Sequence, residues 1–222
     1  MNLALFDLDG TLIPKDSDHA FGEFIITLGW ADAGDFRRRN DDFYDDYTAG
    51  RLDIEAYVEF ATAPWRDRSN SELLKATERF VETVVRPMLA PQALALVQRH
   101  QRAGDVVAIV TATNDFVTRP IAQALGVSEL IATELARDEL GRVTGAIHGV
   151  PSFREGKVTR VQQWLARRGL ALEGFSRSTF YSDSTNDLPL LERVSEPVAT
   201  NPGPALERIA LERGWPVLKF FP

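Results

Sequence analysis

The sequence predicts an α/β protein: a doubly wound parallel sheet with an all-helical cap inserted after strand 1. Two observations predict the sheet. Leu3–Phe6 is apolar without alternation, as in a strand buried on both faces of a parallel sheet, and later apolar runs alternate with helical segments. A third observation predicts the cap, because residues 16–86 show only helical periodicity. We therefore expect an α/β core domain of residues 1–14 and 88–222 and a cap of residues 15–87.

The composition narrows the class of protein. The 222 residues, 44% of them hydrophobic, fit a core domain with an insert. A net charge of -7 argues against a nucleic-acid or membrane partner. The sequence has no cysteine, which excludes disulfides and thiolate catalysis and fits a cytoplasmic protein. Its three histidines lack metal-ligand spacing. No apolar run approaches the ~20 residues of a membrane span, and the N-terminus leads directly into a strand, so no signal peptide is expected.

Four helices are expected in the cap. Glycines end the first two helices, at Gly29 and Gly50. The third begins at Asp53, and Ser69–Glu72 is typical of a capping box at the start of the fourth. A helical insert at this point in the chain would form a lid above the residues that follow the first strand.

The remainder of the chain returns to alternating strands and helices. Proline-containing linkers, 13–15 and 86–88, would join the cap to the core. The expected strands are 106–110, 130–133, 179–181, 197–199 and 216–219, with a hairpin over 135–148. The expected helices begin at Pro91, Gly156, Leu188 and Pro204, and Asp115 would cap a further helix.

Polar side chains follow these strands or begin these helices, where the cleft of an open α/β sheet collects them. They are Asp7 with Asp9, Thr111, Lys157, and Asp183 with Asp187. Each alone has an ordinary explanation as a helix cap, a solvated charge or a turn. Their ordered combination indicates one site.

These residues resemble the four motifs of the haloacid dehalogenase (HAD) superfamily of phosphotransferases. Its first motif, a strand followed by Asp-x-Asp-Gly-Thr, is matched by residues 6–11, and the second by 109–111. The third and fourth are matched by 156–157 and 182–187. The resemblance covers nearly the whole chain, and the insert is similar to the type-1 cap of the phosphoserine-phosphatase-like (type IB) branch. It implies a HAD-like Rossmannoid core and a Mg²⁺-dependent phosphatase.

The resemblance, together with the chemistry of phosphoryl transfer, assigns roles to the acidic residues. Asp7 would attack phosphorus and form an aspartyl-phosphate, and Asp9 would act as general acid and base. Mg²⁺ would be held by the carboxylates of Asp7 and Asp183 and the backbone carbonyl of Asp9. Asp187 would orient the water shell of the metal.

The phosphate itself would be bound by donors from three segments. Lys157 and the Thr111 hydroxyl would contact its oxygens, helped by backbone N–H groups near Gly10 and Ala112. Asn186 would donate a hydrogen bond to the phosphate or to the substrate.

The cap is expected to select the substrate. In phosphoserine phosphatases a cap acid holds the substrate amine and an arginine holds its carboxylate. Asp16 stands near the position of that acid, but residues 54–60 contain no basic side chain, and Thr-Ala-Thr-Asn at 111–114 replaces Ser-Gly-Gly. Asp16 and Asp18 suit a cationic leaving group, such as that of histidinol phosphate, which a branch resembling this chain hydrolyses. The alternative is that these acids are solvated or cap a helix.

Other functions are left open by the sequence. They are a phosphoserine phosphatase, a phosphotransferase to an acceptor other than water, and a non-catalytic binding module of the same fold. A binding module would be expected to lose Asp7, Asp9 or Lys157, and all three are present. The expected partner is a small phosphorylated metabolite, bound by a monomer or a homodimer.

Overall fold

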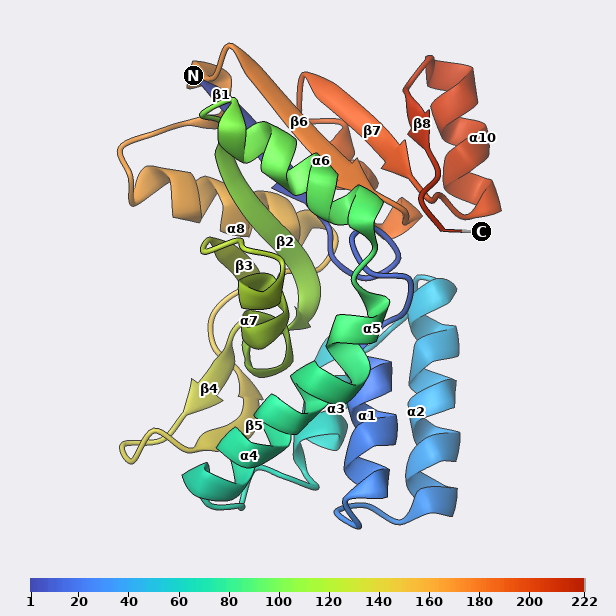
Figure 1. Ribbon diagram of the computed structural model, residues 1–222, viewed down its shortest axis with the longest axis vertical. Helices are drawn as coiled ribbons and strands as arrows, with labels where there is room; N and C mark the ends of the chain where they lie inside the picture. Colours follow the sequence, from blue (N-terminus) through green and yellow to red (C-terminus); the bar gives the residue numbers. More distant parts are fainter. Residues whose placement is uncertain (222) are drawn as a thin grey trace.

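The computed structural model describes residues 1–221. At its centre is a six-stranded sheet with the order β3-β2-β1-β6-β7-β8, in which neighbouring strands are parallel. The chain winds outward in one direction from β1 and in the other from β6, so the crevice beyond their carboxyl ends is a topological switch point (Figure 1). The strands are β1 (Asn2–Phe6), β2 (Val106–Asn114), β3 (Leu130–Thr133), β6 (Arg177–Ser182), β7 (Glu196–Thr200) and β8 (Val217–Leu218).

Helices cover both faces of the sheet. Because side chains alternate along a strand, Ala4 and Phe6 pack on the same side as α6, while Leu3 and Leu5 pack on the side of α8. Figure 1 shows α6 in front of the sheet and α8 behind it. The helices of this part are α6 (Pro91–Arg102), α7 (Asp115–Ala124), α8 (Glu155–Ala166), α9 (Leu188–Leu191) and α10 (Pro204–Arg213), with short turns η2 (Leu172–Gly174) and η3 (Thr185–Asp187). The predicted doubly wound parallel sheet is confirmed.

Helices fill the segment between β1 and α6, beyond the carboxyl ends of the central strands (Figure 1). The side chain of Asp53 caps α3, and Ser69 and Glu72 form the predicted capping box. The elements are α1 (Ser17–Thr27), α2 (Ala33–Thr48), α3 (Ile54–Thr62), α4 (Asn70–Phe80), the π-helical turn η1 (Val81–Val85) and α5 (Arg86–Met88).

The expected linker at 86–88 is helical, because α5 continues the helical run from α4 through η1. Pro87 lies just after the π-helical turn η1, where the regular α-helical hydrogen-bond ladder is already interrupted. The helical run therefore crosses the predicted boundary between residues 87 and 88. The division into core and cap stays a prediction, and we use the word cap for residues 15–87.

The second core strand is longer than predicted. β2 continues beyond Val110 to Asn114, with a shift in its register against β3 between these two residues. The apolar signal stops at Val110 because the continuation is polar and faces the crevice. The expected hairpin is present as β4 (Leu135–Arg137) and β5 (Val143–Ile147), and it packs against α3.

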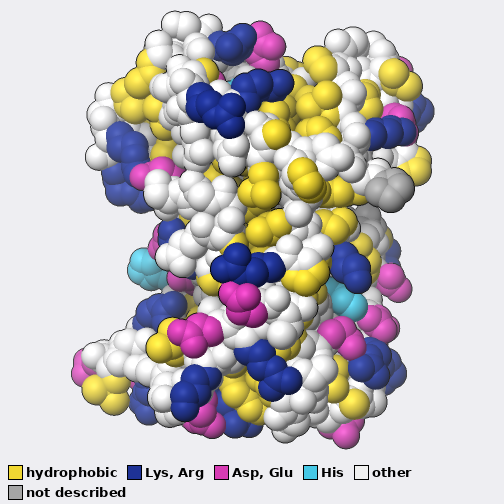
Figure 2. All heavy atoms as spheres, in the orientation of Figure 1, with side chains coloured by type: hydrophobic (Ala, Val, Ile, Leu, Met, Phe, Trp, Pro, Cys, Tyr) yellow, Lys and Arg dark blue, Asp and Glu magenta, His cyan; other side chains and the backbone are white. Residues whose placement is uncertain are grey.

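The surface carries charges of both signs. In Figure 2, basic and acidic side chains are interspersed over the visible face. Within residues 1–221, no single helix is long and apolar enough to cross a membrane, although the bent pair Asn70–Met88 and Pro91–Arg102 passes that test by length and composition when taken together.

Candidate active site

The first predicted site residues meet at the carboxyl ends of β1 and β6. The backbone N–H of Asp7 donates to the carbonyl of Tyr181, which extends the parallel ladder by one residue beyond β1. From the first turn of α8, Lys157 Nζ lies 2.7 Å from Asp7 Oδ1 and 2.8 Å from Asp187 Oδ2. Ser182 donates a further hydrogen bond of 2.7 Å to Asp187. One buried ammonium group therefore holds two buried carboxylates in fixed positions.

The charges at this site are not balanced by Lys157 alone. Burial raises the pKa of Asp7 to about 7, although Lys157 opposes the shift. Burial, together with the charges of Asp7 and Asp187, raises the pKa of Asp183 well above its usual range. Burial lowers the pKa of Lys157, but its two carboxylate partners outweigh that effect and hold its pKa above the ordinary value. A further positive charge beside these carboxyl groups would favour their ionised forms.

Asp9 points away from the lysine, toward the cap. Its Oδ1 accepts a 2.7 Å hydrogen bond from the backbone N–H of Ser17, the first residue of α1. Its Oδ2 accepts a 2.9 Å hydrogen bond from the hydroxyl of Thr113. Burial, reinforced by the charge of Asp16, raises the pKa of Asp9 to about 8. A carboxyl group with such a pKa can carry a proton near neutral pH.

Gly10 lets the loop after β1 approach Asp183 closely. It has φ of +73°, and a Cβ atom there would lie 2.3 Å from Asp183 Oδ2. The neighbouring Thr11 hydroxyl donates to Asp183 Oδ1 at 3.3 Å. Gly10 is therefore required both by its backbone conformation and by the space beside the acid.

The donors at this edge fit a hard divalent cation. Within residues 1–221, no three acidic, histidine or cysteine side chains are already arranged as a metal site. Mg²⁺ does not require such a set, because it is held by one or two carboxylates and keeps several waters. The carboxylates of Asp7 and Asp183, with the backbone carbonyl of Asp9, are oxygen donors of the kind it prefers. Burial raises the pKa values of the two acids, and a bound cation would favour their charged forms.

The predicted phosphate-binding residues lie around the same crevice, but the side chain of Asn186 is bound to the cap. Thr111 is buried at the end of β2, and its hydroxyl accepts a hydrogen bond from the backbone N–H of Thr113 at 3.2 Å. Ala112 lines the adjoining cavity. The side chain of Asn186 instead donates to the carbonyl of Tyr47, at 3.1 Å, and so connects the fourth-motif loop to α2.

A cavity lies between the cap and the carboxyl ends of the strands. Among the residues that line it, four are aspartates, and none, in the described part of the chain, is lysine or arginine. The lining residues are Asp7, Asp9, Asp16, Asp18, His19, Asn40, Phe43, Tyr44, Tyr47, Leu52, Ile54, Tyr57, Val58 and 111–114.

The two cap acids differ in their surroundings. Asp16 caps α1 by accepting a 2.7 Å hydrogen bond from the backbone N–H of His19, as the ordinary interpretation expects. Asp18 is buried, and its Oδ1 accepts a 3.0 Å hydrogen bond from the side chain of Asn114. Burial, with the charge of Asp16, raises the pKa of Asp18 to about 7. Asp18 is therefore neither a solvated charge nor a helix cap.

Sequence reasoning missed several residues that connect these elements. Asn114, not the expected Asp115, caps α7, since its Oδ1 accepts from the N–H of Val117 at 3.1 Å. Thr113 could have been found, because residues two apart on a strand share a face and Thr111 had been identified. Arg154 carries no such signal: it has a positive φ of 51° before α8 and donates to the carbonyl of Gly50.

Comparison with known proteins agrees with this geometry. Residues 4–192 match the model of the haloacid dehalogenase-like hydrolase family. The chain belongs to this family. The resemblance and the expectation of an enzyme are both confirmed.

The relatives of this HAD-family hydrolase cover its whole length. A protein named histidinol-phosphatase from Neisseria meningitidis serogroup C is 47% identical over 219 residues, which are 99% of each chain. A crystal structure of a protein of unknown function from Bordetella pertussis Tohama I is 52% identical, covers 99% of each chain and has a TM-score of 0.93. A substrate-bound phosphoserine phosphatase has a TM-score of 0.68 at 18% identity, covering 97% of this chain and 91% of the other, and so shares the fold.

Proposed function

We propose that this HAD-family hydrolase is a Mg²⁺-dependent phosphatase for a small phosphorylated amino alcohol, such as histidinol phosphate. The observation that carries the substrate proposal is the lining of the cavity, which has four aspartates and, among the described residues, neither lysine nor arginine. A carboxylate on the substrate would meet these four acids with no lysine or arginine to offset them, whereas an ammonium group would be attracted. The 47% identical relative is named histidinol-phosphatase.

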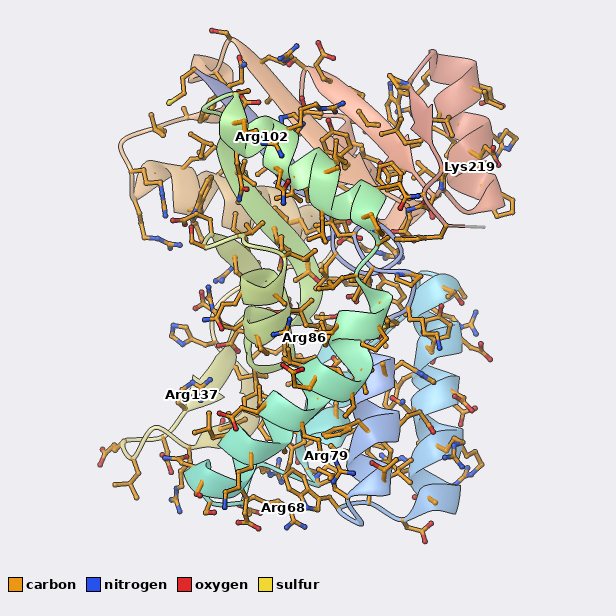
Figure 3. The ribbon with its side chains drawn as sticks, viewed as in Figure 1. Arg68, Arg79, Arg86, Arg102, Arg137 and Lys219 are labelled. Carbon is orange, nitrogen blue, oxygen red and sulfur yellow. The ribbon has the colours of Figure 1, made fainter. Side chains whose placement is uncertain are left out.

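The arginines of the cap support the same choice. Figure 3 shows Arg68, Arg79 and Arg86, which come from the segment that begins just before α4 and ends in α5, and none of them lines the cavity. A phosphoserine phosphatase needs a cation near the substrate carboxylate. This alternative is therefore disfavoured by the cavity.

In the proposed reaction, Asp7 attacks phosphorus and forms an aspartyl-phosphate. Bound Mg²⁺, held by Asp7, Asp183 and the carbonyl of Asp9, would supply positive charge to the phosphate oxygens. Lys157 shifts from its carboxylate partners to share in binding the transferring group, and Thr111 donates its hydroxyl. Before substrate binds, Asp187 holds the lysine beside Asp7 through a 2.8 Å contact.

Asp9 moves the protons. It protonates the leaving oxygen as the P–O bond breaks, and then, as a carboxylate, takes a proton from the water that hydrolyses the aspartyl-phosphate. This role is supported by the hydrogen bonds that Asp9 accepts from Ser17 in the cap and from Thr113, on the side away from the lysine. Gly10 and Ala112 contribute backbone N–H groups to the phosphate, and Asn186 would donate to the substrate after releasing Tyr47.

The test is a panel of phosphate esters assayed with Mg²⁺ and with EDTA. We expect kcat/KM for histidinol phosphate to exceed that for phosphoserine by at least about 100-fold, because an unfavourable charge contact costs several kcal/mol. Phosphoserine as the better substrate would refute the cavity argument. Turnover that survives EDTA would refute the metal requirement.

Two other functions have distinct outcomes in the same panel. A phosphotransferase would divert phosphate to an added alcohol, whereas the proposed hydrolase releases inorganic phosphate throughout. A binding module would turn over none of the esters. We also propose that the enzyme acts in the cytoplasm on a free metabolite, as a monomer or homodimer.

A further inference from the structure

The end of β2 carries two threonines on one face, Thr111 and Thr113. The hydroxyl of Thr113 donates to Asp9 Oδ2 at 2.9 Å, although the two residues are 104 positions apart in the chain. Thr113 is 8% exposed, so this hydrogen bond is largely shielded from water. It is a contact between the strand that carries the second motif and the second aspartate of the first motif.

The other oxygen of Asp9 is held from the cap. Its Oδ1 accepts from the backbone N–H of Ser17 at 2.7 Å. With one donor on each oxygen, the plane of the carboxyl group is fixed. Thr113 is itself held, because its backbone N–H donates to the Thr111 hydroxyl at 3.2 Å. Without the Thr113 hydroxyl, Asp9 Oδ2 would lose its donor and the carboxyl group could rotate.

Other buried threonines show what a purely structural hydroxyl does in this fold. Thr118 donates to the carbonyl of Asn114 at 2.7 Å, and Thr62 donates to the carbonyl of Val58 at 2.7 Å. In both cases the hydroxyl donates to a backbone carbonyl one helical turn earlier in the chain. Thr113 instead bonds to a distant carboxylate.

We propose that Thr113 is a positioning residue for Asp9, which holds the carboxyl group so that its proton is directed at the leaving oxygen. This inference rests on the proposed function, in which Asp9 gives a proton to the ester oxygen as the P–O bond breaks and the Asp7–P bond forms. Thr113 gains and loses no proton. Its hydroxyl donates to Asp9 Oδ2, so the O–H of the protonated carboxyl group is not taken up by Thr113 and is free to point at the leaving oxygen.

The experiment compares two esters whose leaving groups differ in their need for a proton. An alkyl phosphate needs protonation of its leaving oxygen, and p-nitrophenyl phosphate scarcely does. The quantity measured is kcat/KM, which reports the steps up to the first irreversible one, the transfer to Asp7. Thr113→Val should lower kcat/KM at least about tenfold for the alkyl phosphate and less than about threefold for p-nitrophenyl phosphate.

Three further variants complete the design. Thr113→Ser keeps the hydroxyl and should restore kcat/KM for both esters. Thr118→Val removes a buried hydroxyl that does not touch Asp9 and should leave the ratio of the two kcat/KM values unchanged. If Thr113→Val does not fold, which circular dichroism would show, Thr113→Ala takes its place.

The outcomes separate this inference from the function on which it rests. If Asp9→Asn discriminates between the esters but the Thr113 variants lower both equally, or lower neither, the positioning role is wrong while the role of Asp9 stands. If Asp9→Asn itself affects both esters equally, the acid role of Asp9 fails and the positioning role fails with it.

Discussion

The ammonium group of Lys157 lies 2.7 Å from the carboxylate of Asp7, and both side chains are buried. The two residues are 150 positions apart, so the contact exists only when β1 and α8 are packed on the same sheet. A buried ion pair costs desolvation free energy on both sides, and removing one partner leaves the other uncompensated. Lys157 and Asp7 should therefore respond differently to substitution.

Asp7→Asn should abolish turnover while leaving the protein folded. Lys157 keeps Asp187 as a partner at 2.8 Å, and the substitution removes a carboxylate whose pKa is raised by burial. We expect the rate with p-nitrophenyl phosphate to fall at least about 10³-fold and the melting temperature to stay the same or rise. The exposed Asp67→Asn is the matched control and should change neither. Substantial activity in Asp7→Asn would rule out the nucleophile.

Lys157→Met should destabilise the fold as well as the activity. The substitution leaves Asp7 and Asp187 buried without their shared cation. In urea unfolding at pH 8 without Mg²⁺, we expect a loss of about 3–5 kcal/mol in the free energy of unfolding. Lys75→Met, at an exposed position, provides the control and should cost little. Equal stabilities for the two variants would contradict the importance of the buried contact.

Gly10→Ala should weaken Mg²⁺ binding. An added Cβ would lie 2.3 Å from Asp183 Oδ2 and would displace this proposed ligand. We expect the Mg²⁺ concentration at half-maximal activity to rise at least about tenfold, and EDTA to silence the parent enzyme until Mg²⁺ is restored. Gly104→Ala is the control. Gly104 has nearly the same φ, +74°, but nothing lies within 4 Å of an added Cβ atom. This variant therefore has the backbone strain without the clash. An equal Mg²⁺ requirement in both variants would place the metal elsewhere.

Asp18→Asn should change how stability depends on pH. Burial raises the pKa of Asp18 from 3.8 to about 7, so between these values the folded state binds a proton that the unfolded state has lost. The contribution of Asp18 to stability is therefore fully present below about pH 4 and declines as pH rises through 7. An amide does not titrate, so Asp18→Asn should be more stable than the parent at pH 8 by up to about 4 kcal/mol.

Urea unfolding at pH 4 and pH 8, with EDTA present, measures this difference. At each pH, the free energy of unfolding of the parent is subtracted from that of the variant. This subtraction removes the contribution of the other carboxyl groups whose pKa values are raised. If the difference in the free energy of unfolding between variant and parent does not change with pH, the pKa of Asp18 is not raised in the folded state. The same variant should lose its preference for a cationic leaving group if Asp18 attracts the substrate amine.

Much of the fold followed from local patterns. The unbroken apolar run of β1 predicted a strand buried on both faces, and the capping box Ser69–Glu72 located the start of α4. The patterns were less informative where packing extends an element beyond its local signal. The strand at 106–110 continues to Asn114 through polar residues, and the segment expected as a linker at 86–88 is helical.

The sequence by itself determined which chemical groups the site contains and that they follow strands or begin helices. Asp7, Asp9, Lys157 and Asp183 could be named because parallel strands share one carboxyl edge and motif spacing does not depend on packing. Only the tertiary structure decided their partners. The pairing of Lys157 with Asp7, of Thr113 with Asp9 and of Asn114 with Asp18 joins segments about 100 to 150 positions apart, and no local pattern encodes such a distance. The physical reason is that burial and charge, which set these carboxyl pKa values, are produced only when the segments pack together.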